Sequence, residues 1–325
     1  MAASDRIDVD KPLYDVSTFM GRFRHFAWMT DPRTCVLSNE RLLEAKQLVE
    51  SYKKGEALDT PPEKIKYAMK LYQSAFHPDT GELQNFAGRM SFQLPGGMLI
   101  TGAMLAFYRT VPAVVCWQFV NQSFNAVVNY TNRNANSPTT VTQLGVSYVS
   151  ATSSALVAAI GLKGYWTRTA PPIFQRFVPF AAVAAANCVN IPLMRQNEII
   201  NGIEVKDENG NIVGKSRTAA VKGISQVVLS RISMAAPGML ILPFIMERIE
   251  KFEAYKRIKW INAPLQTALV GCFLLFMVPT ACSLFPQICA LNTSTIKRLE
   301  PEFYEEMVKN TNGKVPEKVY FNKGL

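Results

Sequence analysis

The sequence predicts an all-α integral membrane protein, in which about five hydrophobic helices follow a soluble helical N-terminal region. Two observations carry this prediction. Residues 83–197 contain no Asp and no Glu, and long apolar runs with little or no charge recur from residue 95 onward. A soluble domain of that length normally has charges of both signs on its surface, because charged residues make up about a quarter of a globular domain.

The first 82 residues have the charge balance of a soluble region, with 13 acidic and 12 basic side chains. Ser38 predicts the start of a helix that ends at Gly55. The sequence Thr60-Pro61-Pro62-Glu63 predicts a second helix start, and Pro78 stops that helix. We therefore divide the chain into a soluble helical region, a transmembrane helical domain and a C-terminal tail, at residues 1–94, 95–290 and 291–325.

Membrane spans are expected wherever roughly 20 helical residues are apolar. Five runs meet this description, at residues 95–120, 144–162, 177–194, 225–246 and 263–286. The first contains Arg109 and the fourth contains Arg231. An arginine inside a span is costly, and it is either a functional residue or one that extends its side chain back to the head groups. Both interpretations stay open for these two residues.

Most signatures of enzymes and metal sites are absent from the sequence. Both histidines, His25 and His77, precede the spans, and the six cysteines show no C-x-x-C spacing. We therefore expect no metal, no cofactor and no catalytic residue. Residues 210–216 resemble a phosphate-binding loop, but they have three residues between the glycines where the motif needs four.

The basic residues occur singly between apolar runs, so the net charge of +10 suits membrane lipid better than nucleic acid.

A stripe of amide side chains is the strongest indication of a site. Gln118, Asn121, Asn125, Asn129 and Asn132 recur at spacings of 3, 4, 4 and 3, which is the period of one helix face. Burying amides in lipid without partners is costly, so this face must meet other helices, water or a solute. Two interpretations stay open: hydrogen bonds between helices, which hold membrane bundles together, and the lining of a solute path.

Candidate substrate-binding residues lie on this stripe and in neighbouring spans. They are Asn121, Asn125, Asn129, Arg109, Asn187 and Asn190. The last two precede Pro192, where their amides either join the stripe or satisfy a kinked backbone. If Arg109 is a functional residue, a substrate carboxylate is one candidate partner, because the first three spans offer it no acidic residue. A neutral or zwitterionic solute fits these residues better than a cation.

Several long motifs resemble the sideroflexin family, and the likeness covers essentially the whole chain. They are residues 77–82 (HPDTGE), 121–133, 176–195 and the ending at 319–325. Residues 90–98 and 271–279 are similar to the sideroflexin-2 branch of that family.

The resemblance implies a multi-pass protein of the mitochondrial inner membrane without a cleaved presequence. It implies transport of small neutral amino acids, above all serine, in support of one-carbon metabolism, with a link to iron and haem homeostasis. The alternative is a membrane scaffold or assembly factor that affects iron and haem indirectly and uses the soluble region for docking. The family supplies no settled binding residues, so none of the candidates above rests on it.

Overall fold

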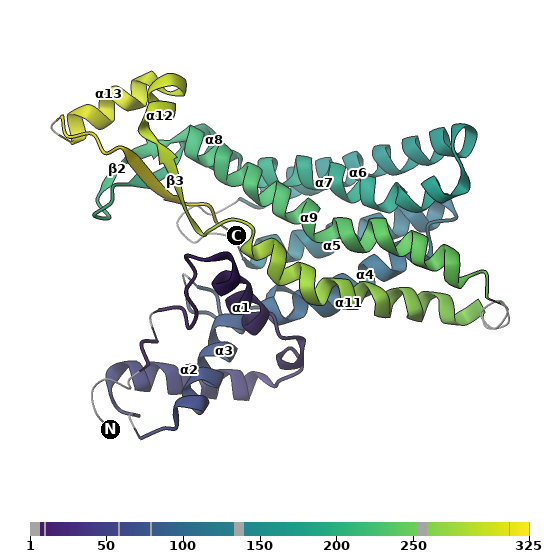
Figure 1. The fold of residues 1–325 in the computed structure, drawn as a ribbon, viewed down its shortest axis with the longest axis horizontal. Helices are drawn as coiled ribbons and strands as arrows, with labels where there is room; N and C mark the ends of the chain where they lie inside the picture. The colour runs from purple at the N-terminus through teal and green to yellow at the C-terminus, as the bar shows by residue number, and fades with distance from the viewer. Residues whose placement is uncertain are drawn as a thin grey trace. The chain divides into compact units, whose positions relative to one another are not determined.

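The computed structural model describes residues 7–9, 11–57, 59–78, 80–132, 140–252, 259–311 and 313–324, and its chain forms two compact units (Figure 1). Unit 1 contains residues 1–107, 123–132 and 237–283, and unit 2 contains residues 108–122, 133–236 and 284–325. Two long helices, α5 (Val111–Thr131) and α9 (Arg217–Ile249), contribute residues to both. Asp79, Arg133 and Leu325 of the motifs quoted above lie outside the described residues.

Unit 1 begins with three helices, α1 (Phe19–Met29), α2 (Asn39–Lys54) and α3 (Pro62–Ala75). Both predicted ends of α2 are confirmed: the side chain of Ser38 caps its start, and Gly55 ends it in the left-handed conformation with φ of 86°. The second predicted helix is confirmed as α3, which begins after Pro61 and ends before Pro78. The apolar faces of α2 and α3 form one buried core.

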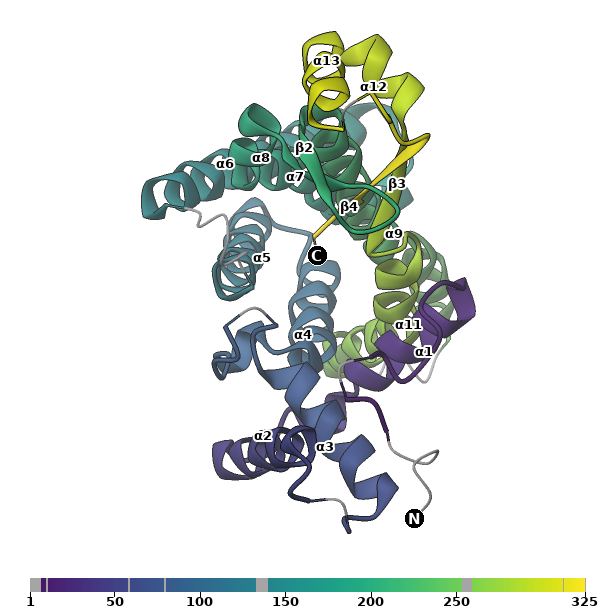
Figure 2. The same cartoon turned by 90° about the vertical axis from the view of Figure 1, so that its left-hand side faces the viewer.

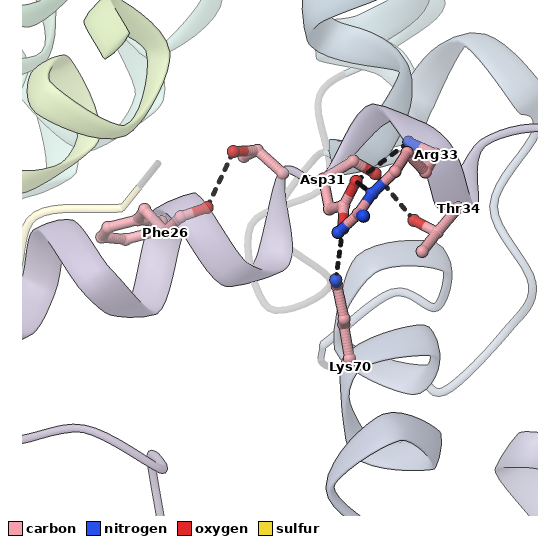
Figure 3. A network of polar contacts seen from close by, with 6 residues as sticks. Phe26, Asp31, Arg33, Thr34 and Lys70 are labelled. Atoms are coloured by element: carbon pink, nitrogen blue, oxygen red, sulfur yellow. Dashed lines mark hydrogen bonds and ion pairs between the residues drawn. The ribbon is translucent and has the colours of Figure 1, made fainter. Parts of the chain in front are cut away.

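The turn after α1 is held by the carboxylate of Asp31 (Figure 3). Arg33 donates from Nη2 to this carboxylate at 2.7 Å, and Lys70 of α3 donates from Nζ at 2.5 Å. The backbone carbonyl of Asp31 also accepts a hydrogen bond from the hydroxyl of Thr34. The hydrogen bonds from Arg33, followed by those from Lys70, hold the pKa of Asp31 well below its usual value, although burial opposes the shift.

The apolar part of unit 1 contains α4 (Gln93–Ala106) and α11 (Asn262–Ser283), which pack closely. Gly102 permits this approach, because a Cβ atom there would lie 2.5 Å from the hydroxyl oxygen of Thr267 and 2.7 Å from its Cα. Helix α1 also packs on α11 (Figure 1). The N-terminal region is therefore folded directly against an apolar helix that is long enough to span a membrane.

Unit 2 is built around the pair α6 (Val141–Thr169) and α7 (Val178–Met194), which lie side by side in Figures 1 and 2. A 3-10 segment, Pro172–Phe177, connects them. The pair is antiparallel, because the side chain of Gln143 near the start of α6 donates to the backbone carbonyls of Leu193 and Met194 at the end of α7. Small residues along α6 let the two helices approach closely.

Unit 2 also contains a four-stranded sheet that the sequence analysis did not predict. Its strands β1 (Ile203–Lys206), β2 (Ile212–Ser216), β3 (Ile288–Asn292) and β4 (Lys318–Asn322) are antiparallel in the order β2-β1-β4-β3. The short helices α8 (Gln196–Asn201), α12 (Thr293–Leu299) and α13 (Pro301–Asn310) accompany it. One face of the sheet packs on α12 and α13 (Figure 1), so the predicted C-terminal tail is largely folded.

The sequence 210–216, which resembles a phosphate-binding loop, has a structural explanation. Gly210 lies in the hairpin turn with φ of 85°, and the stretch from 212 to 216 is strand β2. Ser216 caps the start of α9, because its hydroxyl accepts from the backbone of Ala219 at 3.1 Å and donates to the carboxylate of Glu300. Gly210 and Ser216 therefore have structural roles within the fold.

The predicted membrane bundle is confirmed, but its first span is not. Among the described residues, four stretches are long and apolar enough to cross a membrane, namely Val141–Thr169, Pro172–Met194, Arg217–Ile249 and Asn262–Ser283.

The predicted span 95–120 is two helices, since α4 ends at Ala106 and α5 begins at Val111. Pro112 favours this break, because a proline fits the first turn of a helix and disrupts a helix interior. The placement of Arg109 within a span was therefore wrong: it is exposed in the connection.

Candidate functional site

The N-terminal half of α5 carries a buried line of residues within unit 2. Val114, Gln118 and Gln122 follow at intervals of four, so they share one helix face, and all three are buried. Val114 belongs to an apolar cluster with Ala155 and Ala159 of α6. The two glutamines extend the same face by two further turns, so α5 turns amide groups toward an interior that is otherwise built from small apolar residues.

Helix α6 contributes a hydroxyl to the same interior. Its buried residues recur every four positions and include Ser147, Ala151 and Ala155. The rings of Phe119 and Tyr148 meet edge to face, with 5.9 Å between their centroids. Because Phe119 follows Gln118 in α5 and Tyr148 follows Ser147 in α6, this contact brings the level of Gln118 on α5 beside the level of Ser147 on α6.

Three of these polar side chains have buried atoms without a hydrogen-bond partner among the described residues. The atoms are Oε1 of Gln118, Nε2 of Gln122 and Oγ of Ser147. The exposed fractions of the three residues are only 1%, 3% and 1%. An unsatisfied buried polar group costs about 1–3 kcal/mol, and most such groups in folded proteins find a partner. These three groups, on α5 and α6, make up the candidate site.

Gln143 in α6 is a buried amide whose hydrogen-bonding groups do have partners. Gln143, one turn before Ser147, donates to the end of α7 and accepts a hydrogen bond from Nδ2 of Asn197 at 3.2 Å. It therefore joins α6 to α7 and is fully used within the fold. Among the described residues, Gln118, Gln122 and Ser147 have no comparable contact between helices.

The electrostatics of this interior are neutral. Helices α5 and α7 contain no charged residue, and the two bases of α6, Lys163 and Arg168, lie at the end of α6 away from Ser147. Amides and hydroxyls both donate and accept hydrogen bonds. Such a set can bind an ammonium group and a carboxylate at the same time without favouring either net charge.

The predicted amide stripe is divided by the structure. Asn121 lies in unit 2 beside the buried line, is half-buried, and has an Nδ2 atom without a partner among the described residues. Asn125 and Asn129 are half-buried and belong to unit 1. Asn132 is structural, because its amide group bonds Gln84 and the backbone of Gly88.

The remaining predicted residues fall in three different environments. Asn190 is buried in α7, and Asn187, one turn earlier, is half-buried. Arg109 is exposed in the connection before α5, so the structure does not bring it to the buried glutamines. Arg231 lies inside α9 as predicted and is half-buried.

Gln118, Gln122 and Ser147 were not among the predicted site residues, although Gln118 belonged to the predicted amide stripe. Gln122 could have been found from its spacing of four from Gln118, which places both on one face. Ser147 shares a face with small residues, so its sequence pattern favours close helix packing. Its burial, which requires coordinates, distinguishes its hydroxyl from the other serines of α6.

Comparison with known proteins identifies the family. The family model of the sideroflexins matches residues 8–325. Sideroflexin-2 of Drosophila melanogaster is 75% identical over 99% of this chain and 99% of its own length, and sideroflexin-2 of Homo sapiens is 57% identical over 98% of each. Sideroflexin-1 of Homo sapiens is 51% identical over 98% of each chain. No solved structure matches the chain. The protein therefore belongs to the sideroflexin family.

Proposed function

We propose that this protein carries small neutral amino acids, serine first among them, across the mitochondrial inner membrane and so supports one-carbon metabolism. The observation that carries the proposal is the set of buried, unpartnered groups on Gln118, Gln122 and Ser147. The family resemblance supports the compartment and the class of solute. A link to iron and haem homeostasis belongs to the same proposal, as an indirect consequence of transport.

The chemistry of the three side chains suits a zwitterion. An amide oxygen accepts from the ammonium group of the solute, an amide nitrogen donates to its carboxylate, and the Ser147 hydroxyl can do either. A short polar side chain, such as that of serine, adds a further hydrogen bond. Binding then supplies the partners that the buried atoms lack in the protein alone, which favours the solute over lipid in this interior.

The test is uptake of labelled serine by the purified full chain in liposomes. We expect Gln122→Leu to reduce uptake at least several-fold and to leave the unfolding temperature in detergent unchanged or higher, because the substitution strands no partner. Gln73→Leu is the matched control: Gln73 in α3 also has a buried amide oxygen without a partner, but it lies in the N-terminal region. It should keep normal uptake. Normal uptake by Gln122→Leu would refute the proposed site.

A membrane scaffold is the second candidate, and one surface feature favours it. A pocket of about 500 Å³ in the N-terminal region is lined by three aromatic rings, Tyr14, Trp28 and Tyr67, together with charged side chains. Such a pocket suits docking of a partner protein. If the purified protein shows no serine uptake while Tyr67→Ala abolishes capture of a partner, the scaffold function replaces transport.

A further inference from the structure

Unit 2 has a strongly uneven charge distribution along its helices. All nine of its acidic residues occur in segments 198–208 and 300–317, which belong to α8, the sheet and the helices around it. These segments follow the end of α7 or pack on the sheet. The opposite end of the α6–α7 pair has only basic residues, because the sequence from 83 to 197 contains no acid.

Three elements meet at this basic end. Lys163 of α6 donates from Nζ to the backbone carbonyls of Tyr108 and Arg109, at 3.0 and 2.6 Å. The guanidinium of Arg176, in the 3-10 segment before α7, lies 6.0 Å from the ring centroid of Tyr108. Lys163 thus fixes the connection before α5 beside Arg176. The fold concentrates positive charge here by specific contacts.

Two further arginines extend this cluster into solvent. Arg109, whose backbone is held by Lys163, is exposed, and Arg168 is exposed in the last turn of α6. Together with Lys163 and Arg176 they are four basic residues at this end of the α6–α7 pair within unit 2, and we call these four residues the basic cluster. An arginine fork bonds two phosphate oxygens at once, so such a cluster suits a phosphate group better than a halide or a single carboxylate.

The surface next to the basic cluster is apolar. Val157 of α6 is 74% exposed, and Ile160, one turn nearer the cluster, is exposed too. Tyr165 and Phe174 are also exposed near the end of the same helix pair, and the ring of Phe174 packs on Trp166 at 5.9 Å. Aromatic residues at a helix end are typical of the boundary between hydrocarbon and head groups. Positive charge therefore adjoins a surface suited to acyl chains.

We propose that this basic cluster is a binding site for an anionic diacyl phospholipid. The arginines contact the phosphate of the head group, and the acyl chains lie along the exposed face of α6. The occupant is a lipid and not a soluble phosphate, because the charged groups are continuous with the apolar face of a helix that is long enough to cross the membrane. The inference does not depend on which solute the protein transports.

The test is native mass spectrometry of the purified full chain with dioleoyl phosphatidylglycerol or dioleoyl phosphatidylcholine. We expect retention of phosphatidylglycerol well above that of phosphatidylcholine, and a reduction of at least several-fold in the double variant Arg109→Gln with Arg168→Gln. Both side chains are exposed, so the variant should fold. The matched control is Arg298→Gln with Lys309→Gln, which removes two exposed bases from α12 and α13 of the same unit and should retain the lipid.

Four outcomes would overturn the proposal. Equal retention of the two lipids would show that the charge of the head group does not matter. Unchanged retention by the double variant, or equal loss in the control, would show that binding is not at this cluster. Displacement of the lipid by inorganic phosphate at the same concentration would identify a soluble anion as the occupant.

Discussion

Arg22 of α1 donates a hydrogen bond of 2.9 Å from Nε to the backbone carbonyl of Ser283, the last residue of α11. Its Nη1 atom also donates to the carbonyls of Val16 and Ser17 before α1. The carbonyls at the end of a helix have no partner within the helix and carry partial negative charge, so a buried arginine stabilises that end. This contact ties the N-terminal region to an apolar helix within unit 1.

Replacing Arg22 should therefore destabilise the fold. Arg22→Gln removes hydrogen bonds from a charged donor, which are worth roughly 1.5–3 kcal/mol, and leaves the buried carbonyl of Ser283 without this partner. The control is Arg24→Gln, because Arg24 lies two residues along the same helix and is exposed. Thermal unfolding of the full chain in detergent should show a lower midpoint for Arg22→Gln only. Equal midpoints for the two variants would contradict the role given to Arg22.

The contacts of Asp31 predict a pH dependence of stability. Its pKa is lowered in the folded chain, chiefly by the hydrogen bonds from Arg33 and then by those from Lys70. A group whose folded pKa lies below its unfolded pKa stabilises the fold above the unfolded pKa, which is about 3.9 for Asp. That contribution is lost as the pH falls through the folded pKa.

Asp31→Asn should therefore lower the unfolding temperature at pH 7 and make it less sensitive to acid than that of the unmodified protein. The measurement is thermal unfolding of the full chain between pH 7 and pH 3. Asp8→Asn is the control, because Asp8 forms an exposed pair with Lys11, and such pairs contribute little. If the Asp31 variant lost as much stability on acidification as the unmodified chain, Asp31 would not be the titrating group.

Local sequence rules predicted the helical N-terminal region well. The start of α2 at Ser38 and its end at Gly55 depend on capping residues that act within one turn, so the sequence alone identifies them. The sheet was missed because its strands come from segments about 70 residues apart, at 203–216 and 288–322, and each is too short to show a clear alternation. Pairing between distant segments decided their structure.

The candidate site was predicted only in part. The helical spacing placed several polar groups on one face of α5, but Gln122, which is buried on the same face as Gln118, was missed. A spacing shows which residues share a face and does not show what that face contacts. Contacts of α5 with α6, such as Phe119 with Tyr148, decide which amides lie in the interior.

Close packing of α4 on α11 predicts that Gly102 tolerates no larger residue. Gly102→Ala would place a Cβ atom against the backbone and side chain of Thr267, and overpacking of this kind costs roughly 1–3 kcal/mol. Gly145→Ala in α6 is the matched control, because a Cβ atom there meets no atom within 4 Å and alanine favours a helix over glycine. We expect a lower unfolding midpoint for Gly102→Ala and an equal or higher one for Gly145→Ala. An unchanged midpoint for Gly102→Ala would mean that the two helices separate at little cost.

The two ends of the amide stripe differ in their contacts. The side chain of Asn132 accepts from Nε2 of Gln84 at 2.7 Å and donates to the backbone carbonyls of Gly88 and Val128 at 3.1 and 2.9 Å. Asn132→Leu therefore strands the amide of Gln84, which is buried, at a cost of about 1–3 kcal/mol.

We expect Asn132→Leu to lower the unfolding midpoint in detergent while serine uptake per folded molecule stays normal. Asn125→Leu should show the reverse pattern if the middle of the stripe lines the solute path, with lower uptake and a midpoint that is unchanged or higher. Both measurements use the same purified preparations, so loss of folding and loss of transport are read separately. Reduced stability in both variants, with normal uptake in both, would assign the C-terminal half of the stripe to helix packing. Gln118, Gln122 and Ser147 would then be the only polar groups proposed to contact the solute.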